Sequence, residues 1–254
     1  MDETKDNELS SVKKAFRILE FIRDSGSVTL SDVTSELSLP KSTAHRYLST
    51  LVAAEYVVRD GDEYELSYAL LSFANHIRAR DPATPLLEAK VEDLADRTGE
   101  LVQFITEEYD RAVYLLQASG GDGVQVDTYA KTFGSLHSTG GGKAILSTWP
   151  RAEVEDFLDR RGLEPVTDWT ITDRGEFLAE LEEIADRGYS VNDQENLEGL
   201  IAVSVPVCDP DGRAIGALSV AGPANRMNRE MIDSELPDLL LNASNELELN
   251  LRLL

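Results

Sequence analysis

Apolar residues recur at helical spacing near the start of the chain. In SSVKKAFRILEFIRDSG this spacing predicts a helix that ends at Gly26, and the residues that show it are Val12, Phe16, Leu19 and Ile22, with Ala15 and Ile18. In VTLSDVTSELSLP a shorter helix follows Thr29 or Ser31 as its N-cap, and Pro40 closes the turn after it. The pattern predicts two helices before residue 41.

A third helix and a hairpin come next. KSTAHRYLSTLVAAEYV gathers its apolar residues on one side, where we expect Ala44, Tyr47, Leu48 and Leu51 to face inward. YVVRDGDEYELS reads as two short strands with Asp60 and Gly61 at the turn. Three helices and a hairpin predict a winged helix-turn-helix domain over residues 11–66, with residues 1–10 as a disordered N-terminus.

The rest of the chain predicts a linker helix and an α+β domain. The segment 67–81, which contains YALLSFANHIRARD, is an apolar helix whose apolar face suits a dimer contact. From residue 82, a helix ending at Gly99 precedes three strand-like segments, LVQFITEE, RAVYLLQAS and GVQVDTYA. Helices intervene before strands resume in GYSVND, GLIAVSVPVCD and RAIGALSVAGP. Two groups of strands around helices predict a GAF-like domain over residues 82–254.

Composition narrows the class of protein. Of 254 residues, 47 are acidic and 24 basic, giving a formal net charge of -23, and the arginines outnumber the lysines 17 to 7. This resembles proteins of salt-in halophiles, whose surface charges are screened when the Debye length falls to about 3 Å at 1 M salt. The first residues are not signal-like and no apolar run reaches the roughly 18 residues of a membrane span, so we expect a cytoplasmic protein. One cysteine and three scattered histidines show no zinc spacing, so we expect no metal and no cofactor.

The acidity is uneven along the chain. Between Ser11 and Arg59 seven residues are basic and five acidic, whereas from Asp60 onward 16 are basic and 38 acidic. The third helix has no acidic residue, although a merely solvated face of so acidic a protein would carry Asp and Glu. The alternative is a three-helix bundle with a solvated polar face. A polyanionic partner, double-stranded DNA, explains better why this segment carries so few acidic residues. The residues suited to phosphate oxygens or base edges are Lys41, Ser42, Thr43, His45, Arg46, Ser49 and, in the hairpin, Arg59.

The segment LHSTGGGKAI invites comparison with a phosphate-binding loop. A Walker A loop needs a glycine five residues before Gly142 and a hydroxyl after the lysine, but the chain has His137 and Ala144 there. What remains is a glycine-rich turn before a helix, which suits a small anion or serves only as a tight turn. Lys143 has three possible roles: it meets a ligand, pairs with a neighbouring acid or lies on the surface.

Four segments in this order resemble the IclR family of transcriptional regulators over the chain after residue 10. They are LPKSTAHRYLSTLV, LHSTGGGKAIL, RGYSVNDQENLEGLIAVSVPV and GALSVAGP. The resemblance implies a DNA-binding dimer, or a dimer of dimers, whose C-terminal domain binds a small metabolite. It also implies ligand contacts at Gly140, Gly141, Asn192, Ala202, Ser219 and Ala221.

At three of these positions the chain departs from the pattern of the family. Well-studied members can have an aspartate, a cysteine and a second serine where this chain has Asn192, Ala202 and Ala221. The expected pocket is therefore less acidic and less polar than one that binds a keto acid, and it leaves sugar acids, aromatic acids and other metabolites open.

These observations predict a regulator whose two recognition helices read an inverted repeat in major grooves about 34–36 Å apart. Its effector is expected to be an organic or sugar acid that controls a catabolic pathway. The alternative is a metabolite sensor whose winged helix contacts protein rather than DNA. We expect no enzyme activity, because His137 and Ser138 are sequence neighbours on a turn and no G-x-S-x-G segment occurs.

Overall fold

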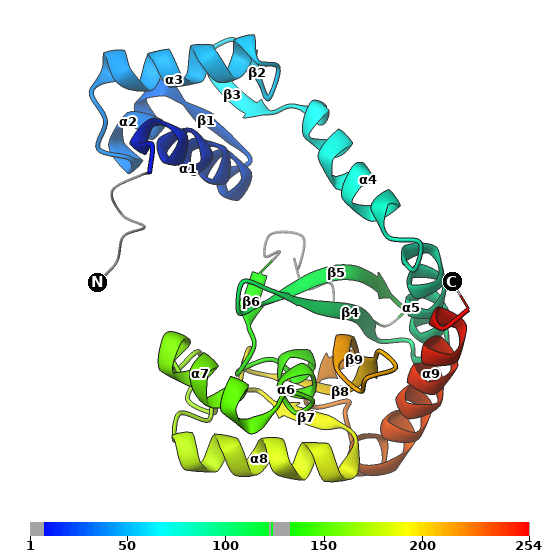
Figure 1. The fold of residues 1–254 in the computed structure, drawn as a ribbon. Helices are drawn as coiled ribbons and strands as arrows, with labels where there is room; N and C mark the ends of the chain where they lie inside the picture. The colour runs from blue at the N-terminus through cyan, green and yellow to red at the C-terminus, as the bar shows by residue number, and fades with distance from the viewer. Residues whose placement is uncertain (1–7, 122, 124–132, 254) are drawn as a thin grey trace. The chain divides into compact units, whose positions relative to one another are not determined.

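The computed structural model describes residues 8–121, 123 and 133–253 of the chain. The chain divides into two compact units, Met1–Asp81 and Pro82–Leu254. Figure 1 shows an N-terminal helical unit with a small sheet and a C-terminal unit built on a larger sheet. This confirms the expected α+β class with an N-terminal helix-turn-helix. In the described part of the chain, no helix is long and apolar enough to cross a membrane.

Three helices form the body of the first unit: α1 (Ser10–Ser25), α2 (Leu30–Glu36) and α3 (Lys41–Ala53). Gly26 follows α1 with a φ of 79°, a conformation that glycine adopts without a steric penalty. Thr29, one of the two expected caps, begins α2. Its side chain accepts a hydrogen bond from the Asp32 amide, and the Asp32 carboxylate accepts one in return from the Thr29 amide at 2.8 Å.

The wing contains one strand more than the sequence indicated. β2 (Val57–Asp60) and β3 (Glu63–Leu66) form the expected hairpin around Gly61, and β1 (Ser27–Thr29) pairs with the other edge of β3. β1 has only three residues, which is too short for a period-2 pattern to show. The resulting order is β1-β3-β2.

The apolar residues at helical spacing in α1 are not all buried. Ile18 and Ile22 are buried in the core of the unit, but Phe16 is 60% exposed and Val12 is also exposed. The apolar face of α1 extends beyond the part that α3 and the sheet cover. The helix also begins at Ser10, inside the segment expected to be disordered, of which residues 1–7 lie outside the described structure.

The predicted linker is a helix preceded by a tighter turn. The 3-10 turn η2 (Tyr68–Leu70) leads into α4 (Leu71–Arg80), and no residue of α4 is buried. The ring of Phe73 lies 5.8 Å from that of Tyr56, so the helix contacts the wing end of its own unit. Its exposed large apolar side chains are Leu71, Phe73 and Ile77.

The second unit is built on a six-stranded antiparallel sheet in the order β6-β5-β4-β9-β8-β7. Its strands are β4 (Leu101–Glu108), β5 (Arg111–Ser119), β6 (Phe133–Ser135), β7 (Ser190–Asp193), β8 (Leu200–Cys208) and β9 (Ala214–Pro223). The predicted strand GVQVDTYA falls on residues 123–130 and, except for Gly123, lies outside the described residues. The strand β6 was not predicted.

Helices cover both faces of this sheet (Figure 1). α5 (Thr84–Thr98) and α9 (Leu236–Leu251) pack on one face over an apolar core that includes Phe104 and Leu218, and the π-helical turn Met231–Glu235 leads into α9. α6 (Gly140–Leu146), α7 (Arg151–Arg161) and α8 (Arg174–Arg187) pack on the other face around Ile105 and Phe177. Because side chains alternate along each strand, this second face also receives the polar residues of the central strands.

Candidate DNA-binding surface and effector pocket

The outer face of α3 is polar and carries no acid. Six of the seven residues predicted to contact DNA lie on this helix. Thr43 is half-buried, and the exposed ones are Lys41, Ser42, His45, Arg46 and Ser49. The opposite face buries Ala44, Leu48 and Leu51. The helix is therefore anchored by its apolar face and presents its donors outward, as a helix that enters a major groove must.

The basic side chains of the N-terminal unit differ in whether they form ion pairs within the unit. Its described ion pairs are formed by Lys13, Arg23 and Arg59, so Lys41 and Arg46 stand outside them. In the wing, Arg59 Nε donates to the Gly61 carbonyl at 2.8 Å and its guanidinium lies 5.6 Å from the Tyr64 ring centre. Arg59 thus stiffens the turn of the wing, while Lys41 and Arg46 remain available to an outside partner.

A row of polar residues crosses the sheet of the second unit beneath α6. The strand register pairs Ser190 with Ser204, Ser204 with Ser219, and Ser219 with Gln103. Ser190 Oγ donates to the Gly140 carbonyl at 2.7 Å, and Ser204 Oγ donates to Ser219 Oγ at 2.8 Å. The row places hydrogen-bonding groups in the interior of the unit, directly against the glycine-rich turn.

A cavity of about 60 Å³ lies beside this row. Five of the six predicted effector contacts line it: Gly140, Asn192, Ala202, Ser219 and Ala221. The sixth, Gly141, does not line it, because the position of its absent side chain faces Ile105 on β4. The structure therefore brings together residues that are up to 81 positions apart in the sequence, and their contact with an effector remains a prediction.

The three glycines of the turn have packing reasons of their own. A Cβ at Gly142 would come within 2.1 Å of the Leu136 carbonyl oxygen, and one at Gly141 within 2.6 Å of Ile105 Cδ1. A Cβ at Gly140 would meet Ser204 Oγ at 2.6 Å. The segment GGG is thus required for α6 to lie close to the sheet, whether or not a ligand binds there.

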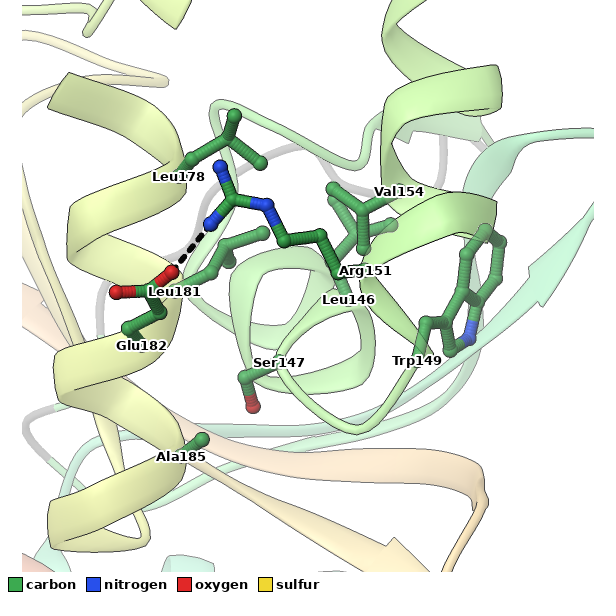
Figure 2. Close-up of a pocket in the computed structure, with 9 residues that line it drawn as sticks. All are labelled: Leu146, Ser147, Trp149, Arg151, Val154, Leu178, Leu181, Glu182 and Ala185. Carbon is green, nitrogen blue, oxygen red and sulfur yellow. Dashed lines mark hydrogen bonds and ion pairs between the residues drawn. The ribbon is translucent and has the colours of Figure 1, made fainter. Parts of the chain in front are cut away.

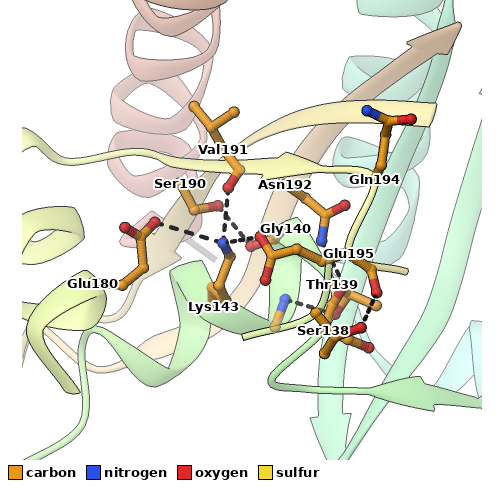
Figure 3. Close-up of polar contacts among 12 residues, drawn as sticks. Ser138, Thr139, Gly140, Lys143, Glu180, Ser190, Val191, Asn192, Gln194 and Glu195 are labelled. Atoms are coloured by element: carbon orange, nitrogen blue, oxygen red, sulfur yellow. Dashed lines mark hydrogen bonds and ion pairs between the residues drawn. The ribbon is translucent and has the colours of Figure 1, made fainter. Parts of the chain in front are cut away.

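Lys143 pairs with acids instead of lining the cavity. Its Nζ lies 2.5 Å from Glu195 Oε1, 2.8 Å from the Val191 carbonyl oxygen and 3.5 Å from Glu180 Oε1 (Figure 3). Burial raises the pKa of Glu195 despite the opposing effect of Lys143. Of the three roles left open for Lys143, the structure selects the ion pair with a neighbouring acid.

The Lys143 ion pair fastens one wall of the cavity. Glu195 lies in the loop between β7 and β8, which supplies Asn196 and Leu197 to the cavity lining. The hydroxyls of Thr167 and Thr170 donate to the carbonyl oxygens of Gln194 and Glu195, each at 2.8 Å. The ion pair with Lys143 and the hydrogen bonds from the two threonine hydroxyls therefore hold this loop in place.

His137 and Ser138 do not form a nucleophile and its base. His137 Nε2 lies 2.9 Å from the Glu164 carbonyl oxygen, and burial lowers the pKa of the imidazole. Ser138 Oγ is buried with no hydrogen-bond partner among the described residues. Because the imidazole is turned to a backbone carbonyl, it does not activate the neighbouring hydroxyl.

A larger cavity of about 110 Å³ lies between α6, α7 and α8 (Figure 2). Its walls are mainly apolar and include Leu146, Leu178 and Leu181. The two charged residues at it, Arg151 and Glu182, form an ion pair with each other. This cavity therefore offers a ligand apolar walls without a free charge, whereas the smaller one offers a cluster of neutral polar groups.

Sequence reasoning missed several residues that line the smaller cavity. Gln103 and Tyr114 come from β4 and β5, and Asn196 and Leu197 from the loop before β8. Gln103 did leave a signal, because it is the single polar residue in the apolar run LVQFI at the start of β4. Asn196 left none, since the loop that carries it has no periodicity.

Comparison with known proteins identifies the class of both units. Residues 11–61 match the IclR helix-turn-helix domain, and residues 82–248 match the C-terminal domain of bacterial IclR transcriptional regulators. The chain is 27% identical over 247 residues to the probable HTH-type transcriptional regulator ArcR of Halobacterium salinarum, with 96% of this chain and 94% of that protein covered.

Solved structures agree with these matches. The IclR protein of Thermotoga maritima aligns with a TM-score of 0.80 at 30% identity, over 96% of this chain and 99% of that one. A PobR inducer-binding domain from Acinetobacter, solved as a double mutant with 3-hydroxybenzoic acid, aligns with a TM-score of 0.60 at 25% identity, over 65% of this chain and 96% of that one.

Both family models, and the Halobacterium relative, are those of transcriptional regulators. The chain belongs to the IclR family of transcriptional regulators.

Proposed function

We propose that the protein is a sequence-specific regulator that reads an inverted repeat in double-stranded DNA and responds to a small organic or sugar acid. The observation that carries the DNA-binding part is the outer face of α3, which is exposed, free of acid and rich in donors in a chain of net charge -23. Lys41, Ser42, Thr43, His45, Arg46 and Ser49 are the proposed contacts of this helix, with Arg59 on the wing.

We infer that the effector binds in the cavity beside the polar row. Gly140, Asn192, Ala202, Ser219 and Ala221 line it together, and the related PobR domain was solved with an aromatic acid. Tyr114 is the only ionisable residue among the described ones that line the cavity, and burial raises the pKa of its hydroxyl. An acid would therefore be held by neutral hydrogen-bond donors.

We propose a homodimer, or a pair of dimers, as the active form. The large apolar side chains of α4, Leu71, Phe73 and Ile77, are all half or more exposed, and Val12 and Phe16 on α1 add to the exposed apolar surface of the unit. Such surface marks interaction sites in proteins. A dimer would present two α3 helices to successive major grooves about 34–36 Å apart.

The effector acts in this proposal by a difference in affinity. A ligand changes DNA occupancy only if it binds two conformations unequally, and couplings of about 1–3 kcal/mol are typical. The acidic surface and the likeness to a Halobacterium regulator also support function at high salt. There counterion release adds little to DNA affinity, so base contacts and DNA shape must supply more of it.

A binding-site selection in molar KCl tests the proposal. Purified protein, shown to be folded and dimeric by light scattering, is mixed with random duplex DNA, and the enriched sequences are read. An enriched inverted repeat is the expected result. If nothing is enriched, the selection is repeated with pooled metabolites; enrichment only then means that the bound state needs its effector.

The second candidate is a sensor whose winged helix contacts protein. The exposed Val12 and Phe16 of α1 favour it, because a protein interface needs exposed apolar surface. The polar outer face of α3 opposes it. Failure to enrich any sequence in either selection, from a folded dimer, would favour this candidate over DNA reading.

A further inference from the structure

Gln103 is a buried amide whose nitrogen has no partner. The side chain is 5% exposed, and Nε2 makes no hydrogen bond to any described residue. Buried polar groups are almost always bonded, and an unpaired one costs stability. An exception of this kind calls for an explanation, and a ligand that supplies the missing acceptor is one.

The place of Gln103 in the sheet connects it with the candidate effector cavity. It lines the cavity, and the strand register sets it opposite Ser219, another lining residue. Ser219 Oγ accepts the proton of Ser204, so its own proton remains available to a further acceptor. Rotation about the last side-chain bond of glutamine presents either end of the amide to the cavity, because such sp³–sp² torsions are broad.

Two donors therefore meet at one end of the cavity. Asn192 is already engaged, since its Nδ2 donates to the Ser138 carbonyl oxygen at 2.5 Å. Lys143 is also engaged, by Glu195 and Glu180. Gln103 Nε2 has no partner among the described residues, and the Ser219 hydroxyl keeps a proton to give, so both can donate to a ligand at this end of the cavity.

We infer that Gln103 determines the specificity of the effector site: its amide and the Ser219 hydroxyl donate to one acceptor oxygen of the ligand, a carboxylate or keto oxygen. The inference rests on the proposed function, because it names the group that the effector must present. The apolar neighbours Ile105, Leu197 and Leu200 would then face the carbon skeleton of the same ligand.

The test uses the full-length protein in molar KCl with Gln103→Met, which keeps the length of the side chain but removes the donor. Without ligand, the melting temperature of this variant should rise by about 2–4 °C, because an unpaired buried donor is gone. The matched control is Ser204→Ala in the same polar row. Its hydroxyl is satisfied, so its loss should lower the melting temperature.

Ligand binding is measured by the thermal shift and by titration with pyruvate, gluconate and 4-hydroxybenzoate. Gln103→Met should bind the acid that stabilises the wild-type protein at least tenfold more weakly. Gln103→Glu, which replaces the donor by a negative charge, should weaken the same acid further.

The outcomes separate the inference from the proposed function. If none of the acids stabilises the wild-type protein, the proposed effector class is wrong and the inference falls with it. If the wild-type protein responds and Gln103→Met binds the acid equally well, only the inference is wrong. A lower melting temperature of ligand-free Gln103→Met would also overturn it, because the amide would then be a satisfied structural group.

Discussion

Lys143 Nζ and Glu195 Oε1 lie 2.5 Å apart, and their side chains are 1% and 7% exposed. The pair joins α6 to the loop that forms one wall of the candidate effector cavity. A buried charge is costly unless it is paired, so each member holds the other in place. In the segment GGGK, Lys143 therefore positions one wall of the cavity without lining it, whereas Gly140 lines the cavity.

Lys143→Met should lower the free energy of unfolding by about 3–5 kcal/mol, because Glu195 would be left buried and unpaired. Denaturant unfolding in molar KCl measures this. The matched control is Lys90→Met, which breaks a Lys–Glu pair of 2.7 Å whose Glu246 partner is 60% exposed. That change should cost no more than about 1 kcal/mol. Similar losses in both variants would show that the Lys143 pair is not special.

The cost of Lys143→Met should depend on pH. Burial raises the pKa of Glu195, so the folded protein binds this proton more tightly than the unfolded chain does. The carboxyl group therefore favours the folded state at low pH, and this contribution is lost as the pH rises from the ordinary pKa through the raised one. Removing Lys143 removes the main opposing effect and raises this pKa further.

The difference in unfolding free energy between Lys143→Met and wild type should therefore become smaller as the pH falls from about 7.5 to about 5. Unfolding curves of both proteins at the two pH values test this. The double variant Lys143→Met/Glu195→Leu lacks the Glu195 carboxyl group, so its difference from wild type should change less with pH than that of Lys143→Met. A gap for Lys143→Met that widens toward low pH would contradict the raised pKa of Glu195.

The sequence predicted local features well and distant contacts poorly. The cap at Thr29, the helix end at Gly26 and the acid-free α3 depend on residues close in sequence, and all are present in the structure. The partner of Lys143 is 52 positions away, and no local pattern links the two residues. Phe16 fits the helical spacing of apolar residues in α1, but the spacing alone does not show that its side chain is 60% exposed.

The candidate cavity shows the same difference between local features, which were predicted, and distant contacts, which were not. Five of the residues that the resemblance named line this cavity, and they occur in recognisable segments of the sequence. Gln103 and Asn196 were not predicted. Gln103 reaches the cavity because β4 pairs with β9, and Asn196 because the loop before β8 forms one wall of the cavity. Strand register, which a single sequence does not fix for non-adjacent strands, is what assembles the polar row.

Arg46→Ala should abolish discrimination between the selected DNA site and random DNA. An arginine that reads a guanine contributes about 1–3 kcal/mol to the specific site only. Lys13→Ala, in contrast, should lower the affinity for both sequences slightly and alike, because Lys13 is exposed and already pairs with Glu8. Fluorescence anisotropy with both duplexes at fixed KCl measures the two effects. Equal losses on both duplexes for Arg46→Ala would exclude a base-reading role.

Gly140→Ala should destabilise the protein, and Ser204→Ala should partly rescue it. The new Cβ would lie 2.6 Å from Ser204 Oγ, which must shift, whereas its next neighbours, at 3.5 and 3.6 Å, are ordinary contacts. Overpacking of this kind costs about 1–3 kcal/mol. The double variant should therefore lose less stability than the sum of the two single variants, with a coupling of about 0.5–3 kcal/mol. Strict additivity in denaturant unfolding would show that the clash is relieved elsewhere.

The stability of the protein should rise with salt. From Asp60 onward the chain has 38 acidic residues and 16 basic ones, so the folded protein repels itself in dilute buffer. Molar KCl shortens the Debye length to about 3 Å and screens this repulsion. The melting temperature should therefore climb between about 0.1 and about 1 M KCl, most of the gain coming as the Debye length falls below the spacing of surface charges. A sucrose series of equal osmolality separates screening from exclusion of solute, because sucrose has no charge. A melting temperature that is flat in KCl, or that rises equally in sucrose, would mean that the acidic surface is not what ties the stability of this protein to salt.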